Sequence, residues 1–222
     1  MTSTLGIVVS LGPDYSPVLL QAEAKEREYE RLEYVDFAED PARSGCPEAI
    51  RHQGYELLES DDGVYCSGFT FLVVWQVLEE HDLLDNRSFT EMKSFRREWY
   101  GAVSGSREKT LVTALLNLGS KEAGYDEPLA IEIVELDEVR PGDFVQFWRE
   151  ESGHSAVVVN MIYRGGEQDP IGIRYLSAQG STDGIGTLSE YFSDSHQYLS
   201  GDELRVANID RDRSYFLRVL LD

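Results

Sequence analysis

The sequence changes texture near residue 130, and this change limits the folds that the chain can adopt. Before it, apolar residues recur at helical spacing. After it come short runs rich in β-branched and aromatic residues, over residues 131–134, 143–148, 155–163, 171–178 and 214–220. Helices followed by strands that are separated only by turns are typical of an α+β protein. We therefore predict helices packed on an antiparallel β-sheet.

The helical part is expected to contain five segments. An acidic helix with one thin apolar stripe covers residues 19–40, and Pro47 is well placed to open a second helix over residues 47–58. Residues 64–80 are apolar on nearly all sides, which predicts a buried helix. Because several of them are β-branched, a strand is the alternative. Two amphipathic helices are expected over residues 90–103 and 106–118.

A strong acidic excess excludes two classes of partner. The 222 residues include 41 Asp and Glu against 20 Lys and Arg, which gives a formal net charge of −21. Because binding to nucleic acid and to anionic lipid depends on clustered Lys and Arg, we expect neither partner. No window approaches the roughly 20 consecutive apolar residues of a membrane span, and the N-terminal stretch lacks the pattern of a secretory signal.

The cysteine content indicates neither a disulfide scaffold nor a zinc site. Cys46 and Cys66 are too few for the first and lack the paired spacing of the second. The sequence does not decide whether these two cysteines form a disulfide. The alternating acidic residues near 210 lack the Gly and Glu of a calcium loop, so we expect no metal and no cofactor.

Cys66 lies where a thiol can be activated, at the start of the predicted buried helix. There the helix dipole and unpaired backbone N–H groups favour a thiolate and can hold an oxyanion. A lone cysteine is more often buried and inert, so a catalytic role needs a base. Among the histidines His52, His81, His154 and His196, His154 stands apart, because it opens a predicted strand directly after the turn at residues 152–153.

Three short motifs, in this order, resemble those of the NlpC-like cysteine peptidases. They are YCSGF at residues 65–69, RPGDFVQFW at residues 140–148 and GHSAVV at residues 153–158. These papain-like enzymes, related to the CHAP amidases, cut peptide or amide bonds in bacterial cell-wall peptidoglycan. The resemblance implies a papain-like catalytic domain over residues 46–222, with an N-terminal extension of residues 1–45 and a helical insertion at about residues 82–123.

The resemblance also implies a catalytic triad. Cys66 matches the nucleophile and His154 the base. Gln179 is our choice for the third polar residue, because its amide can accept the imidazole N–H; Ser177, on the same face of the strand, is the alternative.

Further residues are expected around the substrate. Tyr55, eleven residues before the cysteine, is implied at the oxyanion site together with backbone N–H groups near Ser67. Asp61 and Asp62 are expected at the rim, where a carboxylate can meet a free amine. The sequence departs from the family at Tyr65, where an Asp is usual.

Residues and resemblance together predict a cysteine hydrolase that acts on peptidoglycan-derived peptides or another amide substrate. Two alternatives stay open. The first is a non-catalytic papain-like binding or structural domain whose cleft is closed by the insertion, and the second is an acyl or amide transferase with the same dyad. Wall chemistry implies export, whereas no signal is seen, so the compartment stays open, as does the oligomeric state.

Overall fold

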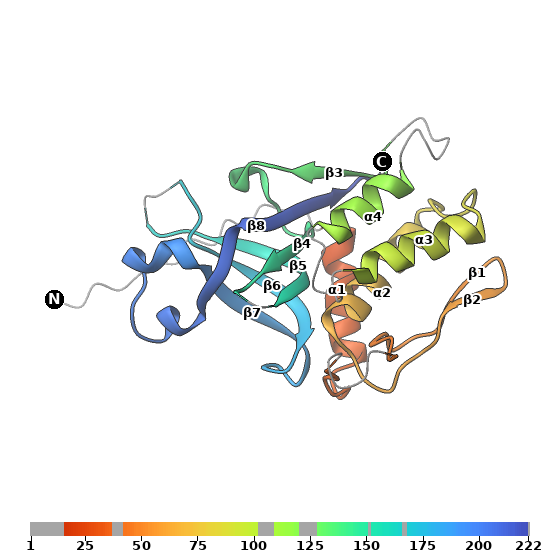
Figure 1. Cartoon of the computed structure of the whole chain (residues 1–222), viewed down its shortest axis with the longest axis horizontal. Coiled ribbons are helices and arrows are strands. Elements are labelled where there is room, and N and C mark those ends of the chain that lie inside the picture. The colour runs from red at the N-terminus through yellow and green to blue at the C-terminus, as the bar shows by residue number, and fades with distance from the viewer. Residues whose placement is uncertain are drawn as a thin grey trace.

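The protein is an α+β fold, as predicted, with helices in the first part of the chain and a six-stranded sheet in the second (Figure 1). The computed structural model describes residues 16–36, 42–101, 109–119, 128–150, 152–165 and 168–221. The helices are α1 (Pro17–Glu28), α2 (Cys66–Glu80), α3 (Phe89–Trp99) and α4 (Thr110–Leu118). The strands are β1 (Ile50–His52), β2 (Tyr55–Leu58), β3 (Ala130–Ile133), β4 (Phe144–Trp148), β5 (Gly153–Ile162), β6 (Gly172–Gln179), β7 (Gly184–Phe192) and β8 (Ala207–Val219).

The large sheet curls until β7, at one end, pairs with β8, the strand next to the other end. Its strand order is β3-β8-β4-β5-β6-β7, and all these neighbours are antiparallel. The first residues of β8 also pair with β7 in parallel, through Tyr191 with Ala207 and Phe192 with Ile209. Because β8 is 13 residues long, its first part can reach β7 while its later part pairs with β4 and β3. The curled sheet therefore has an inner face and an outer face.

The two faces of the sheet bury separate hydrophobic clusters, since successive residues of a strand point to opposite sides. The outer face packs against the helices through Phe144, Val157, Leu176 and Leu217. The inner face holds Val145, Phe147, Ala156, Val158, Tyr175, Phe192, Ile209 and Phe216.

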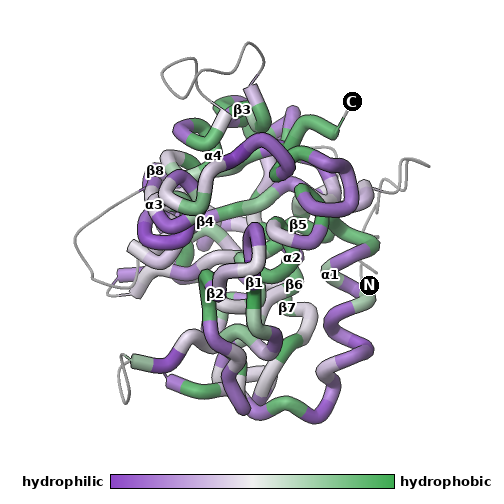
Figure 2. Tube along the Cα trace, turned by 90° about the vertical axis from the view of Figure 1, so that its right-hand side faces the viewer, coloured by the Kyte–Doolittle hydropathy of each residue, from purple (hydrophilic) through white to green (hydrophobic). Residues whose placement is uncertain are grey.

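Helix α2 is the buried helix that the sequence predicts, and the other helices pack around it. Its residues Phe69 to Val74 are all buried. Helix α1 is mostly hydrophilic, as Figure 2 shows, and it joins the same cluster through Val18 and Ala22. Helix α3 begins with a capping box, in which Ser88 and Glu91 bond to each other's backbone, and carries Trp99 against Phe144 of the sheet. No helix among the described residues is long and apolar enough to cross a membrane.

The prediction of a helix over residues 47–58 is wrong. This segment forms the β1–β2 hairpin, which turns at Gln53 and Gly54, both with positive φ. Tertiary contacts explain the difference: Ile50 and Leu57 are buried in the main core, and His52 Nε2 bonds to the Arg87 carbonyl at 2.6 Å. Local spacing cannot reveal such partners.

One boundary and one whole strand also differ from the prediction. Helix α1 ends at Glu28 rather than near residue 40, and the chain then runs extended, because Tyr34 forms a parallel bridge with Val64. Strand β7 was not predicted at all. Its sequence GIGTLSEYF offers few apolar residues, because only part of it is buried. Residues 37–41, 102–108 and 120–127, which the predicted helices and insertion include in part, lie outside the described residues.

Candidate functional site

Cys66 and His154 line the same cavity, which has a volume of about 680 Å³. The cavity lies where the first turn of α2 meets the ends of β4, β5 and β6. Its other lining residues include Tyr34, Asp36, Tyr65, Ser67, Trp148, Arg149, Gln179 and Glu190. The fold therefore brings together the cysteine and the histidine that the sequence singles out, although 88 positions separate them.

Cys66 is the first residue of α2, so its thiol lies beside the unpaired N–H groups of the first helical turn. It is partly exposed, and its Sγ lies 3.9 Å from the Ser67 hydroxyl, a weak contact. Cys46 is also free but fully buried, and burial raises the pKa of its thiol to about 12. The disulfide that the sequence left open is therefore not formed, and Cys66 is the accessible thiol of the two.

The backbone around Cys66 is braced by close approaches between distant segments. The Tyr65 N–H donates to the Gly45 carbonyl at 3.3 Å. One helical turn further on, a Cβ at Gly68 would overlap that same carbonyl oxygen, so only glycine fits there. Tyr65 also donates from its hydroxyl to the Arg43 carbonyl at 3.2 Å. The start of α2 is thus fixed against the preceding loop.

Asp61 and Asp62, which were expected at the substrate rim, lie outside this cavity. Asp61 instead ties the loop before α2 together, because it accepts from Arg43 and from the N–H groups of Gly45 and Gly63. Burial alone would raise the pKa of Asp61, but these donors lower it to about 2. Asp62 is exposed and pairs with Arg43.

His154 is the second residue of β5 and is almost completely buried. Its ring packs against Phe147 and Tyr175, at centroid distances of 5.3 and 5.7 Å. Nε2 has no hydrogen-bond partner within the described chain. Burial, and to a smaller extent the charge of Arg149, lowers the pKa of His154 well below 6.5. The imidazole is therefore neutral at pH 7, and its Nε2 is buried without a partner among the described residues.

The cysteine and the histidine reach the cavity from different sides of the sheet. Ser155 faces the helices, because its hydroxyl lies 3.1 Å from that of Thr70 in α2. By strand alternation His154 points to the inner face, with Phe147 and Tyr175. In the part of the chain that the structure describes, no hydrogen bond joins Cys66 Sγ to His154.

Neither candidate for the third polar residue bonds to His154. Gln179 lines the cavity, but its Oε1 accepts from Arg149 at 3.3 Å and lies 3.2 Å from the Tyr175 hydroxyl. Ser177 is buried and donates to the Ser155 carbonyl at 2.7 Å. The His154 ring is therefore held by its two aromatic neighbours rather than by an amide or a hydroxyl.

Tyr55, expected at the oxyanion site, lies away from the cavity. It is 65% exposed on β2 and packs on Phe89. The tyrosines that line the cavity are Tyr34 and Tyr65. Burial, with a smaller contribution from Cys66, raises the pKa of Tyr34 to about 12, so its hydroxyl stays protonated and can donate. No sequence pattern marks Tyr34, because the Val64 bridge brings it in from a distant segment.

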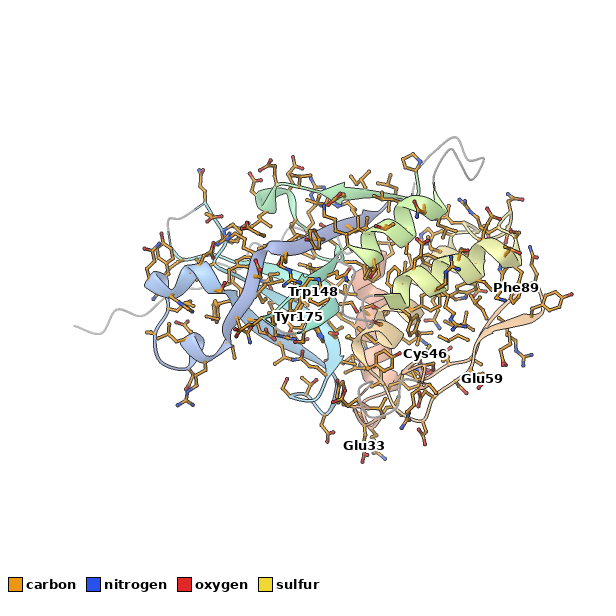
Figure 3. The ribbon with its side chains drawn as sticks, in the orientation of Figure 1. Glu33, Cys46, Glu59, Phe89, Trp148 and Tyr175 are labelled. Atoms are coloured by element: carbon orange, nitrogen blue, oxygen red, sulfur yellow. The ribbon has the colours of Figure 1, made fainter. Side chains whose placement is uncertain are left out.

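An ion pair that the sequence did not reveal forms part of the cavity wall. Arg149 Nε and Nη2 bind the two oxygens of Glu190 at 2.9 and 2.5 Å. The Tyr175 hydroxyl donates to Glu190 Oε1 at 2.5 Å. Figure 3 shows Trp148 and Tyr175 among the strands, whereas Cys46 lies on the helical side. Arg149 follows β4 directly, so proximity to the RPGDFVQFW motif was its only sequence signal.

Comparison with known proteins gives no identification: no protein-family model, no curated protein and no solved structure matches the chain. The residues of the cavity are therefore the basis for assigning a function.

Proposed function

We propose that the chain is a cysteine hydrolase that cleaves an amide bond, with Cys66 as the nucleophile and His154 as the base. One observation supports this most: an accessible thiol at the start of a buried helix and a neutral, unpartnered imidazole line the same cavity. A thiol, a base and backbone N–H donors around one space are the components of nucleophilic amide cleavage.

The reaction would run in two steps. Cys66 Sγ attacks the carbonyl carbon and forms a C–S bond, while His154 receives the thiol proton. The C–N bond then breaks, and His154 returns the proton to the leaving amine; water hydrolyses the thioester in the second step. The first-turn N–H groups near Cys66 and Ser67 would hold the oxyanion, with the Tyr34 hydroxyl as a further donor nearby.

Because the two groups reach the cavity from different sides of the sheet, each would act on a different atom of the amide. The carbonyl carbon would bind against Cys66, and the amine would lie on the His154 side, where the proton is needed. Transfer of the thiol proton across the cavity would then use one bridging water, which is an accepted route for a general base.

The substrate class and the finer fold assignment belong to the same proposal. The order of the three motifs favours a papain-like, NlpC-type domain that acts on peptidoglycan-derived peptides. The α+β architecture, with the cysteine at the start of a buried helix and the histidine on a strand of the sheet, supports this assignment.

Hydrolysis of soluble muropeptides, followed by chromatography, tests the proposal. The Cys66→Ala variant should lose at least about 10³-fold in rate, because the nucleophile is gone. Cys46→Ala is the matched control: it removes the other thiol, which is buried outside the cavity, and should keep its rate per folded molecule. Full activity of Cys66→Ala in a pure sample would contradict the assignment.

A second candidate, a non-catalytic binding domain, is favoured by the lack of a hydrogen bond between Cys66 and His154. Alkylation by iodoacetamide at pH 7 separates the two. An activated Cys66 reacts faster than N-acetylcysteine, whereas a cysteine in a binding domain reacts at the same rate or more slowly.

A further inference from the structure

Arg149 has hydrogen-bond donors that no described residue uses. Its Nε and Nη2 donate to Glu190, and Nη2 also lies 3.2 Å from the Tyr175 hydroxyl and 3.3 Å from Gln179 Oε1. A guanidinium carries five N–H groups, two of them on Nη1. Within the described chain, Nη1 has no acceptor. Two N–H groups of a residue that lines the cavity are therefore available to a ligand.

The guanidinium is also held rigidly. The side chain is only 20% exposed, its bidentate partner Glu190 is 8% exposed, and its planar group stacks on Phe147 at 5.1 Å. A charged fork fixed by a buried carboxylate and an aromatic ring loses little freedom when it binds. Arg149 is therefore arranged for recognition as well as for holding the sheet together.

The carboxylate nearest to Arg149 has no oxygen left for another donor. Both oxygens of Glu190 are already used by Arg149 and Tyr175. Cys66, His154 and Tyr34 also interact electrostatically with Arg149, and a second carboxylate, Asp36, lines the cavity elsewhere. Trp148 gives independent support, because its buried Nε1 donor also lacks an acceptor in the described chain and the residue lines the same cavity.

We propose that Arg149 is a specificity-determining residue that binds a carboxylate of the substrate through its Nη1 N–H groups. Charge-assisted bonds from a guanidinium to a carboxylate are roughly twice as strong as bonds to a neutral acceptor. The substrate class would then be an amide that carries a carboxylate near the scissile bond. The role of Arg149 in turnover rests on the proposed hydrolase function, but its binding of an anion beside Cys66 does not.

The test compares two alkylating reagents that differ in charge. Iodoacetate carries a carboxylate and iodoacetamide does not; with each, the thiolate displaces iodide and forms a C–S bond. We expect the ratio of the iodoacetate to the iodoacetamide rate at Cys66 to exceed that of N-acetylcysteine by about tenfold, measured by peptide mass spectrometry. A ratio equal to that of N-acetylcysteine would overturn the proposal.

Variants assign the effect to the guanidinium. Arg149→Lys keeps the charge and a partner for Glu190 but lacks the fork, and should lower the ratio several-fold. Arg149→Gln combined with Glu190→Gln removes the ion pair without leaving a buried charge, and should bring the ratio to that of N-acetylcysteine. Arg211→Lys is the matched control, since Arg211 is also 20% exposed and paired with a carboxylate but does not line the cavity. An unchanged ratio in Arg149→Lys and in the double variant contradicts the proposal.

A second measurement does not depend on thiol reactivity. In Cys66→Ala, N-acetylglycine should raise the unfolding temperature more than N-acetylglycinamide at equal concentration. Arg149→Lys should reduce this difference, and Arg149→Gln combined with Glu190→Gln should abolish it. If Cys66 proves inert while this difference is seen, the hydrolase proposal fails and the carboxylate site stands. If instead hydrolysis depends on Cys66 while iodoacetate and N-acetylglycine show no advantage over their uncharged counterparts, the carboxylate site fails and the hydrolase proposal stands.

Discussion

Gly68 shows how single residues position the reactive thiol. Its α-carbon lies so close to the Gly45 carbonyl that any side chain would collide with backbone. We therefore expect Gly68→Ala to lower the free energy of unfolding by about 1–3 kcal/mol, because neither segment can move without disturbing Cys66.

Urea denaturation measures this cost, and Gly165→Ala provides its control. A Cβ at Gly165 meets no atom within 4 Å, and that substitution should leave stability unchanged or slightly raised. Equal stability of the two variants would show that the contact between Gly68 and Gly45 is not tight.

His154 gives a pH dependence whose direction follows from its burial. Its pKa in the folded protein is well below the value of 6.5 that it has when unfolded, so below that pH the unfolded chain binds more protons. The contribution of neutral His154 to the free energy of unfolding is therefore complete above pH 6.5. It is lost as the pH falls toward the pKa that His154 has in the folded protein. Between pH 7.5 and 5.5 the wild type should lose about 1 kcal/mol more than His154→Gln, by urea denaturation at each pH. The same loss in both proteins would mean that His154 is solvated.

At this scale the sequence is informative where chemistry and position in a motif coincide. Cys66 and His154 can be selected because a thiol at a helix start and an imidazole at a strand start are recognisable locally. Tyr34 and Glu190 cannot, because distant segments carry them to the cavity by backbone pairing. The choice of Gln179 as the orienting group assumed that it lies next to His154, but its amide is used by Arg149 and Tyr175.

Helix α1 is attached to the loop before β1 by a polar cluster as well as by apolar contacts. Lys25 is 9% exposed and donates to Glu48 at 2.6 Å and to Glu28 at 2.7 Å. Burial by itself would lower the pKa of Lys25, but the two carboxylates raise it, so the amine stays charged. Removing this amine leaves Glu48 without its cation.

We expect Lys25→Met to cost about 1–3 kcal/mol of unfolding free energy. The double variant Lys25→Met with Glu48→Gln should cost less than the sum of the single variants, and a double-mutant cycle by urea denaturation measures this coupling. The control is Arg31→Met, at a residue just after α1 whose side chain is 93% exposed. It should change stability by less than about 0.5 kcal/mol. Strict additivity would show that the cluster does not couple α1 to the loop.

Elements with strong internal periodicity are predictable, and elements defined by their partners are not. Helix α2 and strands β4 to β6 are continuous apolar or β-branched runs, and their predicted positions agree with the structure to within a few residues. The β1–β2 hairpin and β7 carry weak patterns. The first is held by burial against α2 and α3, and the second by pairing with β6 and β8.

The charge of −21 acts on the molecule as a whole. It opposes compaction, since a folded chain brings its like charges closer together. Salt screens this repulsion over about 10 Å at 0.1 M. We therefore expect the urea midpoint to rise between 20 mM and 500 mM NaCl, with KCl giving the same rise. A midpoint that is indifferent to salt would show that the acidic residues are too well separated to repel one another.

The central claim is that Cys66 and His154 act together across one cavity. The most direct test is the rate at which iodoacetamide alkylates Cys66 at pH 7 in the wild type and in His154→Gln, with the fold of each verified by circular dichroism. If His154 serves as the base, the wild type should react faster than the variant by about 10²-fold, the lower end of what a positioned base contributes. Equal rates in two well-folded proteins would contradict the dyad.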